Sequence, residues 1–342
     1  MNDRHPAIVH WSAIEDGAPE PFRGTDEPMS FGAAFGQHFG LLRLGLHHMR
    51  LTPGQRTSLP HAESVEDEFV YVIAGRPDVW LDGGLYPLVP GDGVGFPAGT
   101  GLAHSFLNNS ETEVELLVVG DTDRVENRIV YPINPERKAW RQDWWHDTPK
   151  RALGSHDGLT DLRRGQAAAT HTETGEHPAI VHWTAIENPV AFQHRDRDEP
   201  MSRGAAFGRH FGLKRLGIHH ERLLPGRRTS LPHAESAEEE FVYVIAGSPD
   251  VWLDRHLYPL VPGDGVGFPA GTGLAHTFIN NTGAEVELLV VGEVSKPENR
   301  IIYPLNPERK PLLDDWWEDV PLRGLGPHDG LSDRMRAATA KR

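Results

Sequence analysis

The chain is one unit written twice, and this duplication constrains its fold more than any other feature. The segment HPAIVHW begins at His5 and again at His177, and the segment DWW begins at Asp143 and again at Asp315. The interval is 172 residues in both cases, so the two copies align without net insertion. A period this long indicates a duplicated domain, because the repeats of solenoid proteins are far shorter.

The repeat also predicts the domain limits. A chain of 342 residues is long enough for two domains with their own cores. We expect a first domain at residues 1–162 and a second at residues 177–334. The small and polar segment RRGQAAATHTETGE predicts a linker at residues 163–176, and the final MRAATAKR predicts a flexible tail at residues 335–342.

Each repeat contains many short strand-like runs. EFVYVIAG is β-branched and aromatic and ends at Gly75, LLRLGLHHMRL alternates from Leu41, and DVWLDGGLYPL reads as a hairpin. The 36 glycines and 28 prolines supply turns between such runs. The pattern predicts an all-β fold, either a sandwich or a barrel.

Composition excludes several kinds of site and partner. The chain has no cysteine, which excludes disulfides, thiolate metal sites and cysteine nucleophiles. Its formal charge of −15 argues against nucleic acid or an anionic membrane as a partner. The start, MNDRHPAIVHW, does not have the pattern of a signal peptide, and no apolar run approaches the length of a membrane span. We therefore expect a cytoplasmic protein.

An acid-flanked histidine occurs at the same place in both copies. PHAESVEDEFVYVIAG begins at Pro60, and PHAESAEEEFVYVIAG begins at Pro232. On a strand, His61 and Glu63 face the same side, and Glu68 can join them from the next strand. Imidazole and carboxylate ligands suit iron, manganese, zinc or nickel. The alternative is a solvated acidic loop.

These residues resemble the cupin superfamily. The first cupin motif is matched by Gly54, His61, Glu68 and Gly75. The second motif is matched by Gly91, Pro97, Gly99, His104 and Asn108, and again by the residues 172 positions later. The resemblance covers both halves, so the chain resembles a bicupin. It implies two tandem double-stranded β-helix barrels, that is, jelly-roll cupin barrels.

The resemblance also implies one divalent transition metal per domain, with Fe, Mn, Zn and Ni as the candidates. The chain departs from the family at one place. Glu63 and Glu235 occupy the position at which the first cupin motif has its second histidine. Whether these two glutamates bind the metal directly or orient a ligand histidine is left open. The expected metal residues are His61, Glu63, Glu68 and His104 in the first domain, and His233, Glu235, Glu240 and His276 in the second.

The strand before the first motif carries a second set of candidates. Leu44, Leu46, His48 and Arg50 alternate onto one face, as expected where a barrel floor meets a polar pocket. An arginine there could hold a substrate carboxylate by two hydrogen bonds, or could instead pair with Glu63 or Glu68, or project into solvent. The expected substrate-binding residues are His48 and Arg50, with His220 and Arg222 in the second copy.

Function is predicted from this site. The leading hypothesis is a metal-dependent oxidoreductase, first of all a dioxygenase, acting on a small carboxylated metabolite. The alternatives are an oxygen-independent isomerase, decarboxylase or lyase, or a non-catalytic binding protein, because the cupin fold serves all of these. The expected partner is a small-molecule substrate, and a homo-oligomer is left open.

The duplication predicts how the two barrels pack. Two copies of one unit can reproduce within a chain the self-complementary contact of a homodimer. We expect a pseudo-twofold arrangement that buries the outward residues Phe69 and Tyr71 against Phe241 and Tyr243.

Overall fold

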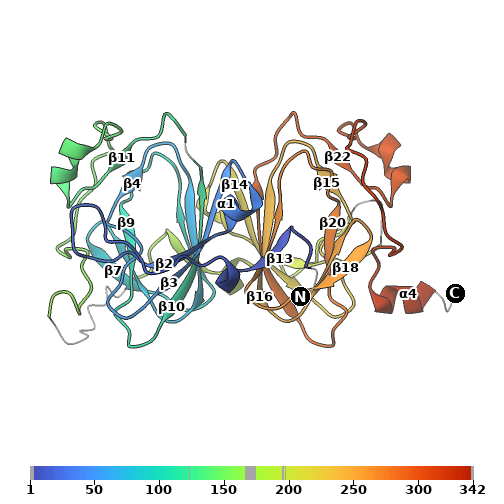
Figure 1. Cartoon of the computed structure of the whole chain (residues 1–342), viewed down its shortest axis with the longest axis horizontal. Helices are drawn as coiled ribbons and strands as arrows, with labels where there is room; N and C mark the ends of the chain where they lie inside the picture. Colours follow the sequence, from blue (N-terminus) through green and yellow to red (C-terminus); the bar gives the residue numbers. More distant parts are fainter. Residues whose placement is uncertain (1–3, 123, 166–174, 195, 197, 340–342) are drawn as a thin grey trace.

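Two β-barrels lie side by side in the computed structural model, which describes residues 4–122, 124–165, 175–194, 196 and 198–339. In Figure 1 the first barrel is coloured mostly blue to green and the second mostly yellow to red, and they are related by a pseudo-twofold. The all-β expectation and the two tandem barrels are confirmed. No helix of the described residues is long and apolar enough to cross a membrane.

The first barrel is built from a six-stranded sheet in the order β12-β8-β5-β10-β3-β2, a three-stranded sheet β7-β6-β9 and a β11-β4 pair. Its strands are β2 (Phe31–Ala34), β3 (Leu44–Leu51), β4 (Ala62–Glu63), β5 (Glu68–Ala74), β6 (Asp78–Leu81), β7 (Gly84–Pro87), β8 (Asp92–Phe96), β9 (His104–Leu107), β10 (Val114–Asp121), β11 (Ile129–Val130) and β12 (Ile180–His182).

The second barrel repeats this topology with sheets β1-β19-β16-β21-β14-β13, β18-β17-β20 and β15-β22. Its strands are β1 (Ile8–His10), β13 (Arg203–Ala206), β14 (Leu216–Leu223), β15 (Ala234–Glu235), β16 (Glu240–Ala246), β17 (Asp250–Leu253), β18 (His256–Pro259), β19 (Asp264–Phe268), β20 (His276–Ile279), β21 (Val286–Glu293) and β22 (Ile301–Ile302). The helical segments are short: η1 (Trp11–Ala13), α1 (Phe35–Phe39), η2 (Pro135–Trp140), α2 (Trp183–Ile186), α3 (Phe207–Phe211), η3 (Pro307–Leu312) and α4 (Asp333–Thr339).

The two repeats exchange their first strands. Strand β1 of the first repeat pairs with β19, with Ile8 opposite Val266, and β12 of the second repeat pairs with β8, with Ile180 opposite Val94. Each barrel is therefore completed by a strand from the other repeat, so the segments 1–162 and 177–334 interlock.

Parts of the expected linker and tail are outside the described residues. Positions 166–174 of the linker and 340–342 of the tail are among those not described. Residues 335–339, which we expected in a flexible tail, form the last part of α4.

Side chains along β5 point alternately into the first barrel and toward the second barrel. Glu68, Val70 and Val72 point inward, whereas Phe69 and Tyr71 point outward and are buried against the second barrel. The expected burial of Phe69 and Tyr71 in one cluster with Phe241 and Tyr243 is confirmed.

The short helices α1 and α3 contribute aromatic rings to this contact. Phe207 of α3 lies with its ring centre 5.0 Å from that of Phe69, and Phe35 of α1 lies 5.0 Å from Phe241. The ring of Phe207 also lies on Gly93 of β8, where a Cβ atom would be 2.5 Å from the ring. Glycine is therefore required there for close approach of the two repeats.

Candidate metal centre

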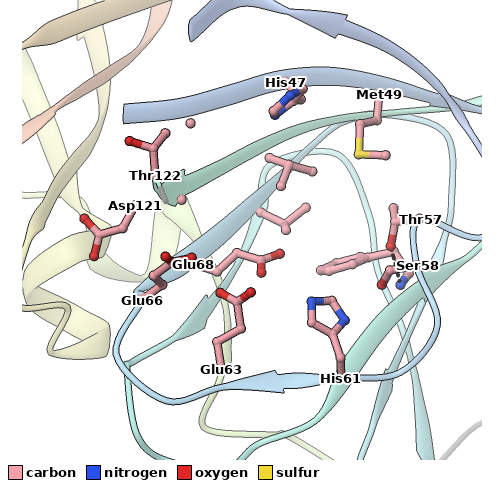
Figure 2. Close-up of a pocket in the computed structure, with 15 residues that line it drawn as sticks. His47, Met49, Thr57, Ser58, His61, Glu63, Glu66, Glu68, Asp121 and Thr122 are labelled. Atoms are coloured by element: carbon pink, nitrogen blue, oxygen red, sulfur yellow. Dashed lines mark hydrogen bonds between the residues drawn. The ribbon is translucent and has the colours of Figure 1, made fainter. Parts of the chain in front are cut away.

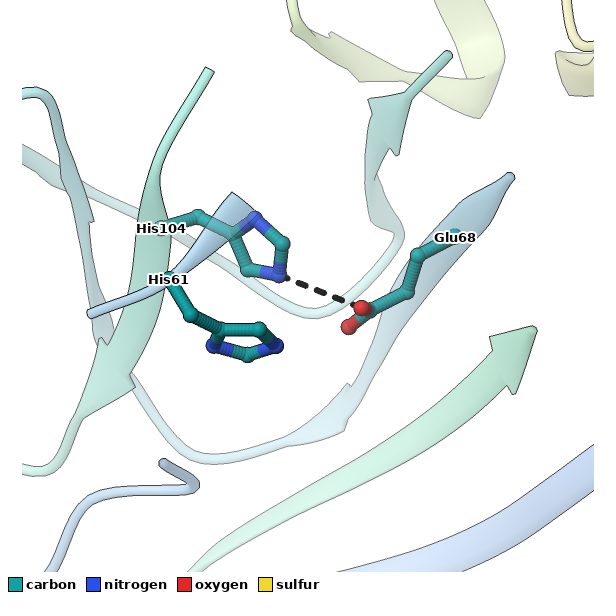
Figure 3. A group of neighbouring side chains, drawn as sticks. All are labelled: His61, Glu68 and His104. Atoms are coloured by element: carbon teal, nitrogen blue, oxygen red, sulfur yellow. Dashed lines mark ion pairs between the residues drawn. The ribbon is translucent and has the colours of Figure 1, made fainter. Parts of the chain in front are cut away.

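Three strands bring two imidazoles and a carboxylate together in the first barrel (Figure 3). His61 directly precedes β4, Glu68 is the first residue of β5, and His104 is the first residue of β9. The backbones of His61 and His104 pair directly, because each N–H donates to the other's carbonyl, at 3.2 and 2.9 Å. The two histidines are thus held side by side, with the glutamate facing them from the other sheet.

The side chains converge on one point. One ligand atom from each of His61, Glu68 and His104 lies within 4.8 Å of the other two. His104 Nε2 is 3.2 Å from Glu68 Oε2, an ion-pair contact that lacks good hydrogen-bond geometry. Among the described residues this buried Nε2 has no hydrogen-bond partner. A buried nitrogen that faces a carboxylate without a hydrogen bond is suited to a metal ion.

The other ring nitrogen of each histidine is anchored to the backbone. His61 Nδ1 is 3.0 Å from the carbonyl oxygen of Leu59, and His104 Nδ1 is 3.4 Å from that of Leu102. Because a carbonyl only accepts, Nδ1 carries the proton in this arrangement and Nε2 keeps its lone pair. Such anchoring orients a ligand histidine.

Electrostatics keep these groups in their ligand forms. Burial is the main cause that lowers the pKa of His61 to about 4, and the neighbouring His104 is the second cause. The imidazole of His61 is therefore neutral at pH 7. Burial acts to raise the pKa of Glu68, but the imidazoles of His104 and His61 outweigh it and hold that pKa below its usual value. Metal ligands must be deprotonated, and both of these are.

The second barrel carries the same group, formed by His233, Glu240 and His276. His276 Nε2 lies 3.4 Å from Glu240 Oε1 and has no hydrogen-bond partner in the described part of the chain. Burial lowers the pKa of His233 to about 4, as in the first barrel. Neither copy has lost a ligand.

Glu63 lies beside the first group but outside the set of converging atoms. Its pKa is raised to about 8, mainly by burial and then by the charges of Glu68 and Glu66. Burial and Glu240 raise the pKa of Glu235 to about 8 in the same way. Both carboxyls are therefore largely protonated at pH 7 in the metal-free chain. A direct ligand role for either stays a prediction.

A cavity of about 470 Å³ opens over the first group (Figure 2). One part is acidic, with Glu63, Glu66 and Asp121, and another is apolar, with Val70 and Phe106. Strand β3 contributes His47 and Met49. These two lining residues were missed from the sequence, because the opposite face of β3 was expected to meet the pocket.

The expected substrate-binding residues lie on the other face of β3. The imidazole of His48 stacks on Trp11, with ring centres 4.4 Å apart, and its Nε2 is 3.1 Å from Glu115. Arg50 pairs with Glu15 and Glu113, and not with Glu63 or Glu68, which were the alternative partners.

The second copy does the same. His220 stacks on Trp183, and Arg222 pairs with Glu187 and Glu285. Since Leu44 and Leu46 pack onto the other barrel, their face of β3 points out of the barrel. The structure does not bring these histidines and arginines to the metal group, and their expected role in substrate binding has no support from this placement.

Comparison with known proteins agrees with the fold. The family described as Cupin domain matches residues 47–120 and 219–292. A protein of Streptomyces cyaneus described as polyketide synthase CurC is 34% identical over 122 residues, which cover 34% of this chain and 70% of that protein.

Two solved structures share the arrangement of both barrels. A variant of salicylate 1,2-dioxygenase from Pseudoaminobacter salicylatoxidans, in complex with gentisate, superposes with a TM-score of 0.56 at 13% identity, covering 89% of this chain and 83% of that chain. A variant of oxalate decarboxylase from B. subtilis superposes with a TM-score of 0.51 at 15% identity, covering 87% and 79%. At these identities the likeness is one of fold.

Proposed function

The chain belongs to the cupin superfamily as a protein of two tandem cupin domains, and we propose that it is a metal-dependent enzyme with dioxygenase activity on a small carboxylated molecule. The observation that carries this proposal is the unpartnered, buried Nε2 of His104, and of His276, facing a carboxylate. A resident ion explains why these nitrogens are left without hydrogen bonds.

The donor set fits a divalent transition metal. His61, Glu68 and His104 would hold one ion, and their counterparts a second. Two imidazoles and one carboxylate with open positions are typical of iron(II) oxygenases, and Mn, Zn and Ni accept the same donors. When bound, the ion supplies a Lewis acid or redox centre at its open positions.

The residues around the group would bind and orient the substrate. Val70 and Phe106 give the cavity an apolar wall that reduces the amount of water near the metal group. The Glu63 carboxyl, whose pKa is raised to about 8 by burial and by Glu68, holds a proton at neutral pH. It can donate a hydrogen bond to a substrate carboxylate oxygen, or transfer that proton to a product.

That protonated carboxyl also favours a second candidate function, an oxygen-independent decarboxylation. Loss of carbon dioxide from a carboxylate leaves a carbanion that must be protonated, and Glu63 lies on the cavity wall where such a proton is needed. The two candidates differ in whether molecular oxygen is consumed.

The test uses protein reconstituted anaerobically with Fe²⁺ or Mn²⁺ and offered gentisate, salicylate or oxalate. Oxygen uptake is measured with an electrode and carbon dioxide release in a sealed vessel. The dioxygenase proposal expects oxygen uptake with an aromatic acid, which is lost in the double variant His61→Ala, His233→Ala. Carbon dioxide release without oxygen uptake would favour the second candidate. Metal binding with no turnover across a broad panel of carboxylic acids would overturn both.

A further inference from the structure

The inner walls of the two barrels are almost identical. Each residue that lines the cavity of the first barrel recurs 172 positions later, with three exceptions. The exceptions are Met49, Asp121 and Thr122, which are replaced by Glu221, Glu293 and Val294. Among the cavity-lining residues, only these three positions can make the two barrels differ in what they bind.

Two of the exceptions lie at the edge of the cavity. Asp121 and Glu293 both take part in ion pairs at the contact between the repeats, Asp121 with Arg215 and Glu293 with Arg43. The residues that follow them, Thr122 and Val294, come after the end of the strand. The remaining exchange, Met49 for Glu221, lies within the barrel and replaces a thioether with a carboxyl group.

The register of its strand places Glu221 beside apolar core residues of the second barrel. It lies opposite Leu288 on β21, which in turn lies opposite Val244 on β16. Leu288 and Val244 belong to the apolar core of that barrel. In the first barrel Met49 packs against the equivalent core, opposite Leu116.

Only one of the two carboxyl oxygens of Glu221 has a hydrogen bond among the described residues. The carboxyl has a hydrogen bond with Ser202, but its Oε2 is buried and has no partner among the described residues. In the first barrel, where Met49 offers no polar atom, the hydroxyl of the equivalent Ser30 is also without a partner in the described part of the chain. A buried carboxyl oxygen without a hydrogen bond destabilises a fold.

The first barrel shows that the fold does not require this carboxyl. The same strand, with the same neighbours, accommodates a methionine at the equivalent position. A destabilising group that the architecture does not need is typical of a functional site. The free Oε2 lies on the inner wall that also carries His219 and the metal-group residue Glu240, so a ligand in the barrel is its available partner.

We propose that Glu221 is a specificity-determining residue, which accepts a hydrogen bond from an ammonium or hydroxyl group at the end of a ligand whose carboxylate lies at the metal group. The first barrel, with Met49 at this place, takes a ligand whose far end is apolar. The two centres of one chain therefore bind different members of one class of carboxylic acid. This inference rests on the proposed function, since it assumes that the ligand's carboxylate is held at the metal group.

The experiment isolates each barrel in the full-length, Co²⁺-loaded chain. His61→Ala leaves the second centre and His233→Ala leaves the first, and binding is followed by the visible spectrum of the cobalt. The probes are butanoate, hexanoate and octanoate, each compared with the analogue that carries a terminal amino or hydroxyl group. The three lengths give probes of increasing reach from the metal group.

In the second barrel we expect at least one polar-ended probe to bind about tenfold more tightly than its parent acid, the effect of one added hydrogen bond. Glu221→Met removes this preference, and Met49→Glu creates it in the first barrel. Glu221→Gln, which keeps the shape and an acceptor, retains part of the preference for the hydroxyl probe. Glu221→Gln keeps the inference testable if the Met49→Glu chain fails to fold.

The absence of any preference for polar ends in the second barrel, including failure of every probe to bind, overturns the inference. So does a preference that survives Glu221→Met. A purely structural role for Glu221 predicts that Glu221→Met lowers the unfolding temperature, whereas we expect it to rise. Cobalt content is measured on the same samples, so that loss of metal, which contradicts the proposed function, is distinguished from retained metal without selectivity, which contradicts only this inference.

Discussion

The two glutamates that follow each motif histidine have opposite electrostatic environments although they lie five residues apart. Glu68 faces two imidazoles, which outweigh its burial and hold its pKa low, whereas Glu63 is buried near two other carboxyls, and its pKa rises to about 8. The sequence predicted that both would lie near His61, because strand alternation and the short loop require it. It did not separate their roles, because each pKa depends on groups that come together only in the fold.

Substituting the two glutamates separately tests this difference. Glu68→Gln removes a charged ligand, and we expect metal affinity to fall by more than about 100-fold, because the remaining donors leave the ion's charge uncompensated. Glu63→Gln preserves the neutral form, and we expect a loss of no more than about tenfold. Isothermal titration with Mn²⁺ measures both. Equal losses would show that Glu63 is a direct ligand.

The pH dependence of metal binding follows from the same groups. Burial and His104 lower the pKa of His61 to about 4, so protons compete with the metal for this imidazole only in acid. We expect affinity to be level from about pH 6 to 8.5 and to fall below about pH 5, as His61 and His233 become protonated. If Glu63 had to lose its proton to bind the ion, affinity would instead rise up to about pH 8 in the wild type and not in Glu63→Gln.

At the scale of elements, the sequence pattern predicted the strands, but it predicted the orientation of β3 wrongly. The face of β5 was assigned correctly, since Phe69 and Tyr71 pack between the barrels. The faces of β3 were interchanged: His47 and Met49 line the cavity, and His48 and Arg50 lie outside. Both faces of β3 carry apolar and polar residues, because one meets the cavity and the other meets the second barrel, so the hydrophobic pattern does not distinguish them.

The exchange of β1 and β12 was not predicted. The three-residue sequence IVH contains no feature that indicates which strand it pairs with. The repeat itself suggests that each barrel is formed by the residues of one copy alone. The glycines indicate close contact between the repeats, although not the exchange of strands. The second motif contains Gly93 and Gly95, whose missing side chains leave room for the rings of α3 from the other repeat.

Gly93→Ala tests this packing. A Cβ atom there would lie 2.5 Å from Phe207 and 2.8 Å from Phe69, so the rings must shift. We expect a destabilisation of about 1–3 kcal/mol, the usual effect of overpacking, and a fall of a few degrees in the unfolding temperature. Gly17→Ala is the control, because nothing lies within 4 Å of its added Cβ. If both variants unfold at the wild-type temperature, the contact between barrels is looser than described.

At the scale of the whole molecule, each metal group is tied to the opposite barrel. Asp67, which precedes Glu68, accepts hydrogen bonds from the backbone N–H groups of Lys214 and Arg215 at 2.7 and 2.9 Å. Glu239, which precedes Glu240, accepts them from Leu42 and Arg43 at 2.8 and 2.9 Å. The strands that carry the ligand glutamates therefore begin at the contact between barrels, and the duplicated chain has the form of a self-complementary dimer joined into one polypeptide.

The central claim is that this one polypeptide holds two complete metal centres, and metal counting tests it most directly. Protein purified without a metal-binding tag is loaded with Mn²⁺ or Fe²⁺, freed of excess ion and measured by elemental analysis. We predict about two ions per chain for the wild type, about one for His61→Ala or His233→Ala alone, and close to none for the double variant. A saturated wild type with fewer than one ion per chain, unchanged by His61→Ala, would contradict the account.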